Sequence, residues 1–282
     1  MSCIDTHIHI WNFERATYSW LDGNTSILNR TYLIDELAPQ LAAAGVTEGV
    51  LVQAANTKEE TAYMLEVAEQ TSWLKGVVGW LPLEQPDEVA TILSAGYAKH
   101  PLFKGVRHLI HDEPDTKWLL QPAVLQSLQL LADAGIPYDV VGVLPAHLET
   151  VLQVLNKVPA LTIVLDHLNQ PPIQQGERFG RWGKLITEIA AYPKAYGKIS
   201  GLGTTTGTGE AWDVDDIKPY VAFAVEKFGT DRCFCGGDWP VSLLASSYAH
   251  AWSVYKQTLS SLLEEKEREK ILYDNAKQFY KL

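Results

Sequence analysis

The chain alternates between two hydrophobic patterns from one end to the other, and this alternation constrains its fold more than any other feature. Short runs rich in apolar and β-branched residues are separated by longer segments in which apolar residues recur at helical spacing. We expect eight strands, at residues 3–10, 49–54, 76–81, 103–109, 137–143, 161–165, 195–200 and 232–236. We expect helices at residues 33–44, 61–71, 89–98, 122–134, 148–156, 182–191, 217–228, 248–263 and 267–280.

Strands that read as nearly continuous apolar runs and alternate with helices are typical of a parallel sheet covered by helices. Eight such units in 282 residues match a (β/α)₈ barrel, whose usual length is about 250 residues. An open doubly wound sheet is the alternative, but the first expected strand is not followed by the glycine-rich phosphate-binding turn of that fold. We therefore predict an α/β fold, a single-domain TIM barrel over residues 1–282.

Composition narrows the class of partner. A formal charge of −11 argues against binding to nucleic acid or to an anionic membrane surface, because both need clustered lysine and arginine. No apolar run reaches the roughly 18 residues that span a bilayer. The three cysteines, Cys3, Cys233 and Cys235, have no spacing typical of a disulfide framework. We expect a cytoplasmic protein that acts on a small molecule. The sequence leaves open whether the protein forms a homo-oligomer.

Polar residues gather where the expected strands end, which is where barrel enzymes place their sites. His7 and His9 lie two apart in the first strand, so their side chains point to the same face. Two histidines spaced in this way are as often structural as functional. Here, however, other strands add polar groups at the same end of the barrel. These are Arg107 and His108 from the fourth strand, Asp139 from the fifth, Asp166 and His167 from the sixth, Lys198 and Ser200 from the seventh, and Asp238 and Trp239 from the eighth.

These groups stand in motifs that resemble a known family. The motifs are DTHIHIW at 5–11, KGVRH at 104–108, LDHL at 165–168, GKISGL at 197–202 and GGDWPV at 236–241. Together they resemble the amidohydrolase superfamily, and most closely its branch of sugar lactonases. The resemblance covers nearly the whole chain. It implies a TIM-barrel hydrolase that opens a sugar (aldono-) lactone to the corresponding acid.

The resemblance leaves the cofactor open. Members that hold metal ions usually have a histidine at the end of the fifth strand, where this chain offers Asp139, and His147 lies farther along the loop. The site therefore holds either no metal or one divalent ion such as zinc. The ligands of that ion would be His7, His9 and Asp238, with His167 as a fourth.

Hydrolysis of a lactone needs an activated water, donors for the oxyanion and a proton for the leaving oxygen. We expect Asp238 to act as the general base for the water. His7, His9 and His167 would polarise the carbonyl, either directly or by holding a cation.

Four further residues are candidates for substrate binding. The guanidinium of Arg107 can hold a pair of oxygens, and the rings of Trp20 and Trp239 can stack on a sugar. His108 follows Arg107, so in an ideal strand it points the other way, and packing outside the barrel is nearly as good an interpretation. The loop 201–209 is either a lid over the mouth or a surface loop.

Two other functions compete with the lactonase. One is a metal-dependent decarboxylase of the same superfamily, which should need a fuller ligand set than this chain offers. The other is a non-catalytic barrel that binds sugar acids, which the presence of His7, His9, His167 and Asp238 disfavours.

Overall fold

The computed structural model describes residues 2–282 and contains one eight-stranded parallel sheet in the order β1 to β8. Its last strand returns to its first: after β8, the backbone N–H of Asp238 donates to His7 O at 2.7 Å, and His9 N–H donates to Trp239 O at 2.7 Å. The predicted TIM barrel is thereby confirmed. The strands are β1 (Ile4–Ile8), β2 (Glu48–Val52), β3 (Leu74–Gly79), β4 (Phe103–His108), β5 (Tyr138–Val140), β6 (Ile163–Leu165), β7 (Ala195–Ile199) and β8 (Cys233–Cys235).

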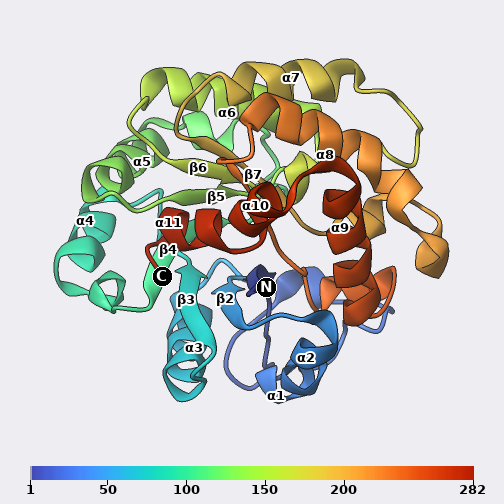
Figure 1. Cartoon of the computed structure of the whole chain (residues 1–282). Helices are drawn as coiled ribbons and strands as arrows, with labels where there is room; N and C mark the ends of the chain where they lie inside the picture. The colour runs from blue at the N-terminus through green and yellow to red at the C-terminus, as the bar shows by residue number, and fades with distance from the viewer. Residues whose placement is uncertain (1) are drawn as a thin grey trace.

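Helices surround these strands (Figure 1). The main ones are α3 (Lys58–Gln70), α4 (Pro86–Ala95), α5 (Pro122–Ala134), α6 (Pro145–Lys157), α7 (Gly180–Ala190), α8 (Val214–Phe228) and α9 (Tyr248–Leu262). Three of them begin at a proline, whose missing N–H costs nothing in the first turn. Within the described chain, none of the helices is long and apolar enough to cross a membrane.

Two predicted helices differ from the structure. The segment 33–44 is divided into α1 (Ile34–Leu37) and α2 (Leu41–Ala44) by a 3₁₀ turn at Ala38–Gln40. Pro39 lies in that turn, and a proline in a helix interior removes one hydrogen bond and crowds the preceding turn. The segment 267–280 comprises the end of α10 (Glu265–Glu269), a π-helical turn at Lys270–Asp274 and α11 (Asn275–Tyr280).

The C-terminal helix closes the floor of the barrel. In Figure 1, α10 and α11 cross in front of the strands near the centre of the molecule. Phe279 and Tyr280 of α11 pack against inward side chains from several strands, which form one apolar cluster: Ile4, Val50, Val52, Val78, Val164 and Phe234. The interior is therefore filled at the N-terminal ends of the strands, and the opposite ends remain for a site.

Candidate active site

A cavity of about 270 Å³ lies at the C-terminal ends of the strands. Its walls combine apolar side chains, such as Leu109 and Val141, with groups that can ionise or donate hydrogen bonds. The second kind includes His9, Trp20, Arg107, His111, His167 and Asp238. A small concave site with a few convergent polar groups is typical of a small-molecule binding site.

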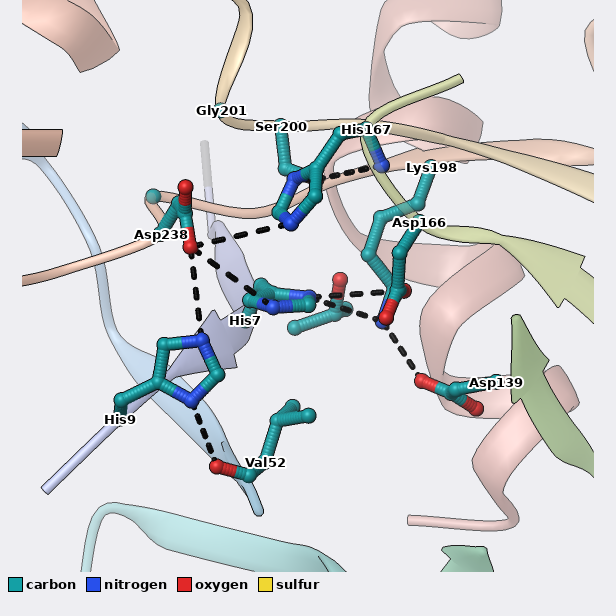
Figure 2. Close-up of polar contacts among 12 residues, drawn as sticks. His7, His9, Val52, Asp139, Asp166, His167, Lys198, Ser200, Gly201 and Asp238 are labelled. Atoms are coloured by element: carbon teal, nitrogen blue, oxygen red, sulfur yellow. Dashed lines mark hydrogen bonds and ion pairs between the residues drawn. The ribbon is translucent and has the colours of Figure 1, made fainter. Parts of the chain in front are cut away.

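Three imidazoles surround one carboxylate oxygen in this cavity (Figure 2). The Oδ1 atom of Asp238 lies 3.4 Å from His9 Nε2, 3.8 Å from His7 Nε2 and 3.9 Å from His167 Nε2. Asp238 has φ of 57°, in the left-handed region that a non-glycine residue adopts at a cost. These residues come from three strand ends that are distant in sequence, so the fold, and no local motif, assembles the cluster.

The first strand places His7 and His9 through a local irregularity. The register of β1 against β2 shifts between Asp5 and Ile8. The Asp5 carboxylate accepts hydrogen bonds from His7 N–H at 2.9 Å and Gly237 N–H at 2.7 Å, and so ties β1 to the end of β8. Burial lowers the pKa of His9, and lowers that of His7 well below the ordinary value. Both rings are therefore neutral at pH 7.

The orientation of His9 is fixed by the neighbouring strand. Its Nδ1 lies 2.7 Å from the carbonyl oxygen of Val52, which can only accept, so Nδ1 carries the proton. The lone pair of Nε2 then faces the carboxylate of Asp238 across 3.4 Å. Two acceptors at this separation call for a water proton or a cation between them.

His167 is aimed at the cluster by a left-handed turn. The four residues 167–170 have φ values of 55°, 49°, 54° and 50°, an unusual run for residues other than glycine. Ser200 Oγ lies 2.9 Å from His167 Nδ1 and holds the ring. Gly201 leaves the space this arrangement needs, because a Cβ there would lie 2.6 Å from His167 Nδ1 and 2.7 Å from Asp238 Oδ2.

Below the histidines lies a fully buried network of charges. Lys198 Nζ is 2.7 Å from both Asp139 Oδ2 and Asp166 Oδ1, and Arg107 Nη1 is 3.2 Å from Asp166 Oδ2. Tyr280 of α11 donates to Asp139 Oδ2 at 2.5 Å. Burial alone would raise the pKa of Asp166. The nearby Lys198, together with His7 and Arg107, outweighs this effect and holds the pKa of Asp166 well below its ordinary value. Asp139 and Lys198 thus lie beneath the mouth.

The donor set fits one divalent ion. His7, His167 and Asp238 each present a ligand atom within 4.8 Å of the others, and His9 Nε2 adds a lone pair nearby. Zinc bonds of about 2.0–2.1 Å in a tetrahedral site put ligand atoms roughly 3.3 Å apart, close to the observed 3.4–3.9 Å around Asp238 Oδ1. Arg107 opposes an ion electrostatically, because its Nη1 lies 3.2 Å from His7 Nε2.

Two of the four predicted substrate-binding residues line the cavity. Trp20 is held by a hydrogen bond from its Nε1 to the carbonyl oxygen of Ala54 at 2.8 Å. Arg107 is held by Gln53, whose side-chain and backbone oxygens both accept from the guanidinium. Gln53 was missed in the sequence, although a polar residue directly after the apolar run of β2 was the available signal.

The other two predicted substrate-binding residues lie outside the lining of this cavity in the described chain. The ring of His108 stacks on Trp118 at 3.9 Å, and Glu113 lies 2.7 Å from its Nε2. Arg107 points inward, so the strand pleat turns its neighbour His108 to the outside. Trp239 is buried and packs edge-on against Tyr32 at 5.5 Å. His108 and Trp239 therefore do not line this cavity, and a role of either in substrate binding stays a prediction.

Known proteins share both the sequence and this architecture. The family described as Amidohydrolase matches residues 4–282. An L-fucono-1,5-lactonase from Burkholderia ambifaria is 34% identical over 282 residues, which cover 99% of this chain and 95% of the relative. An L-rhamnono-gamma-lactonase from Scheffersomyces stipitis is 26% identical, with 99% and 98% covered. The crystal structure of an amidohydrolase from Burkholderia multivorans with bound zinc is 30% identical, with a TM-score of 0.90 and 100% of each chain covered. The protein belongs to the amidohydrolase family.

Proposed function

We propose that this protein is a lactonase that hydrolyses an aldonolactone to the corresponding acid. The observation that carries the proposal is the Asp238 carboxylate, which lines the cavity together with Arg107 and Trp20 and has three imidazoles around it. The names of the L-fucono-1,5-lactonase and the L-rhamnono-gamma-lactonase support the substrate class. A ring such as Trp20 suits the apolar face of a sugar, and a guanidinium suits its oxygens.

In the proposed mechanism, Asp238 accepts a proton from a water molecule as the water attacks the lactone carbonyl. The carbonyl oxygen becomes negative and is stabilised by N–H donors of Arg107, which lines the cavity. When the ring C–O bond breaks, Asp238 returns the proton to the leaving oxygen, which becomes the free hydroxyl. His9 and His167 keep the water and the carboxylate in place.

A divalent ion is compatible with this site. His7, His9, His167 and Asp238 would hold it, as the donor set allows. When bound, such an ion supplies Lewis-acid polarisation and lowers the pKa of a bound water. The zinc in the structure of the amidohydrolase from Burkholderia multivorans makes zinc the first ion to test.

The test is proton release from a panel of aldonolactones that includes L-fucono-1,5-lactone and L-rhamnono-γ-lactone. The protein is stripped with a chelator and assayed with and without added zinc, beside an Asp238→Asn variant. We expect hydrolysis of at least one lactone and a loss of at least 100-fold in kcat for the variant. Activity that needs zinc assigns the ion. No activity in either state would move the interpretation to the decarboxylase or to the non-catalytic binding barrel.

A further inference from the structure

Three successive carbonyl groups at the end of β2 hold three side chains of the cavity wall. They are Val52 O, which accepts from His9, Gln53 O, which accepts from Arg107, and Ala54 O, which accepts from Trp20. A trans peptide unit is planar, and its N–H points opposite to its C=O. The group that binds the N–H of each unit therefore also fixes the direction of the carbonyl and of the side chain that the carbonyl holds.

The N–H groups of these peptide units are held in two different ways. The N–H of Gln53 donates to Val78 O of β3 at 2.9 Å and so continues the sheet. The next two N–H groups donate to the carboxyl of Glu60. Ala54 N lies 2.9 Å from Oε1 and 3.0 Å from Oε2, and Ala55 N lies 2.8 Å from Oε2. Glu60 therefore replaces β3 as the hydrogen-bond partner where the sheet ends.

Glu60 lies in the first turn of α3, but its carboxyl does more than cap that helix. In a capping box, the glutamate at this position binds the N–H of the N-cap residue, which here is Thr57. The N–H of Thr57 donates to Ala55 O at 2.9 Å, and the Glu60 carboxyl binds the preceding loop. Glu60 is fully buried, and burial raises its pKa to about 8, although the two loop N–H groups lower it in part. Its hydrogen bonds to the loop offset the cost of burying an acid.

We propose that Glu60 is a positioning residue, which fixes two successive peptide units and thereby the positions of Arg107 and Trp20. Either protonation state of the carboxyl serves, because Oε2 alone lies within hydrogen-bond distance of both N–H groups. Glu60 is not among the described residues that line the cavity, so it acts on a substrate through those that do. Its effect on catalysis rests on the proposed lactone hydrolysis, and its effect on the two side chains does not.

Glu60→Met and Glu60→Gln separate the hydrogen bonds of this side chain from its bulk. Methionine is similar in length but offers only a weak acceptor, whereas the glutamine oxygen can occupy the position of Oε2. Two-dimensional ¹H–¹⁵N NMR of the indole N–H groups measures the result, and Trp20→Phe assigns the signal among the nine tryptophans. We expect the Trp20 signal to shift in Glu60→Met and to stay in place in Glu60→Gln. A Trp20 signal that does not move in Glu60→Met would overturn the proposal.

Lactone hydrolysis then tests the consequence for the cavity. In Glu60→Met we expect KM to rise about tenfold, because the ring of Trp20 is displaced. We expect kcat to fall about tenfold, less than for a lost oxyanion donor, because Gln53 Oε1 still accepts from Arg107. Glu60→Gln should restore both constants to within about threefold of wild type.

A double variant tests whether Glu60 acts through Trp20. In Trp20→Ala/Glu60→Met, KM should exceed that of Trp20→Ala by less than about threefold, because the ring that Glu60 positions is already absent. Two rises in KM that add in full would contradict this route.

The matched control is Thr61→Val, one residue along α3. Thr61 is also fully buried, and its hydroxyl accepts from Trp80 N–H at 2.9 Å, so this variant also leaves a buried donor unmet. It should lower the free energy of unfolding but leave KM and the Trp20 signal unchanged. An equal shift of the Trp20 signal in the control would mean that any loosening of α3 has this effect, and would refute a specific role of Glu60.

If Glu60→Met does not fold, Glu60→Asp answers the same question. Its carboxyl is withdrawn by one methylene from both N–H groups, so the Trp20 signal should again shift, and a signal in place would overturn the proposal. A protein that hydrolyses no lactone refutes the proposed function and leaves the NMR result intact, so the two failures are distinguishable.

Discussion

At the scale of single residues, position in the barrel separates groups that the sequence presents together. Arg107 and His108 are neighbours, yet Arg107 reaches the cavity and His108 stacks on Trp118 outside it. Trp20 and Trp239 are both aromatic residues near strand ends, yet Trp20 lines the cavity and Trp239 is buried against Tyr32. Residue type and motif therefore select candidates, and the direction of each side chain decides which of them can touch a substrate.

Trp20 should contribute to binding more than to chemistry. We expect Trp20→Ala to raise KM for the lactone about tenfold and to change kcat less than threefold, because a stacking contact is made in the ground state and the transition state alike. The control is Trp73→Ala, which removes a half-buried ring that packs at Gly49 and lies outside the cavity lining. Steady-state kinetics for both variants make the test, and an equal rise of KM in the control would contradict it.

The activity should be insensitive to pH near neutrality. Burial lowers the pKa of His7 and of His9 below the ordinary value of 6.5, so both rings stay neutral as the pH falls from 8 to 6.5. We expect kcat/KM to be level over this range, with any acid limb from these rings below pH 6.5. The unfolded chain binds these protons more readily, so the fold also loses stability below pH 6.5. A histidine-dependent acid limb centred above pH 6.5 would contradict the expectation.

At the scale of elements, the sequence predicts the regular parts of the fold and misses the irregular ones. All eight strands were expected because their apolar runs are long enough to be seen without neighbours. The left-handed turn at 167–170 has only a weak local signal, since His167 and Asn169 tolerate positive φ but Leu168 and Gln170 do not favour it, and contacts such as that of Ser200 with His167 hold it. The same applies to the register shift in β1. These two irregular segments place His7 and His167, so the list of site residues was predictable and its geometry was not.

The Asp5 carboxylate connects three elements by hydrogen bonds, so we expect it to stabilise the fold. Its carboxylate accepts from His7 of β1, from Gly237 after β8 and from Tyr248 Oη of α9 at 2.7 Å. Asp5→Ala leaves these buried donors unmet, so we expect a loss of at least 3 kcal/mol in the free energy of unfolding. At pH 4, where the Asp5 carboxyl of the folded protein is protonated because its pKa is raised to about 6, Asp5→Asn keeps the shape and should cost about 1 kcal/mol. Denaturant unfolding of the two variants measures the difference, and equal costs would show that the hydrogen bonds contribute little.

The Asp5 carboxyl should also make the free energy of unfolding depend on pH, with a defined sign. Burial raises the pKa of Asp5 from 3.8 to about 6, although its hydrogen bonds lower it in part. The folded state therefore binds a proton that the unfolded state has released between pH 4 and 6, and the stability contributed by this carboxyl is lost as the pH rises through that window. Relative to wild type, Asp5→Asn should gain on the order of 1–3 kcal/mol from pH 4 to pH 7. A constant difference would contradict the raised pKa.

At the scale of the whole molecule, the two ends of the barrel interior differ in polarity. The floor is apolar and is closed by α11, and the mouth carries the histidines and Asp238. Between them lies the buried network of Tyr280, Asp139, Lys198 and Asp166, so the last helix is connected to the ring of His7 by hydrogen bonds and ion pairs. In this barrel, α11 therefore contacts both the apolar core and the charge network beneath the site.

Phe279 separates these two contributions, because it fills the floor and has no part in the charge network. Phe279→Ala should lower the free energy of unfolding by about 3–5 kcal/mol, as for other large aromatic residues removed from a core. At 25 °C, where the variant is still folded, we expect kcat within about twofold of wild type, since the hydrogen bond from Tyr280 to Asp139 remains. The control Phe13→Ala removes an exposed ring and should cost less than about 0.5 kcal/mol. Denaturant unfolding and lactone hydrolysis are measured on the same preparations. A fall of kcat in step with the stability of Phe279→Ala would mean that apolar packing on the floor, and not the polar network above it, sets the geometry of the mouth.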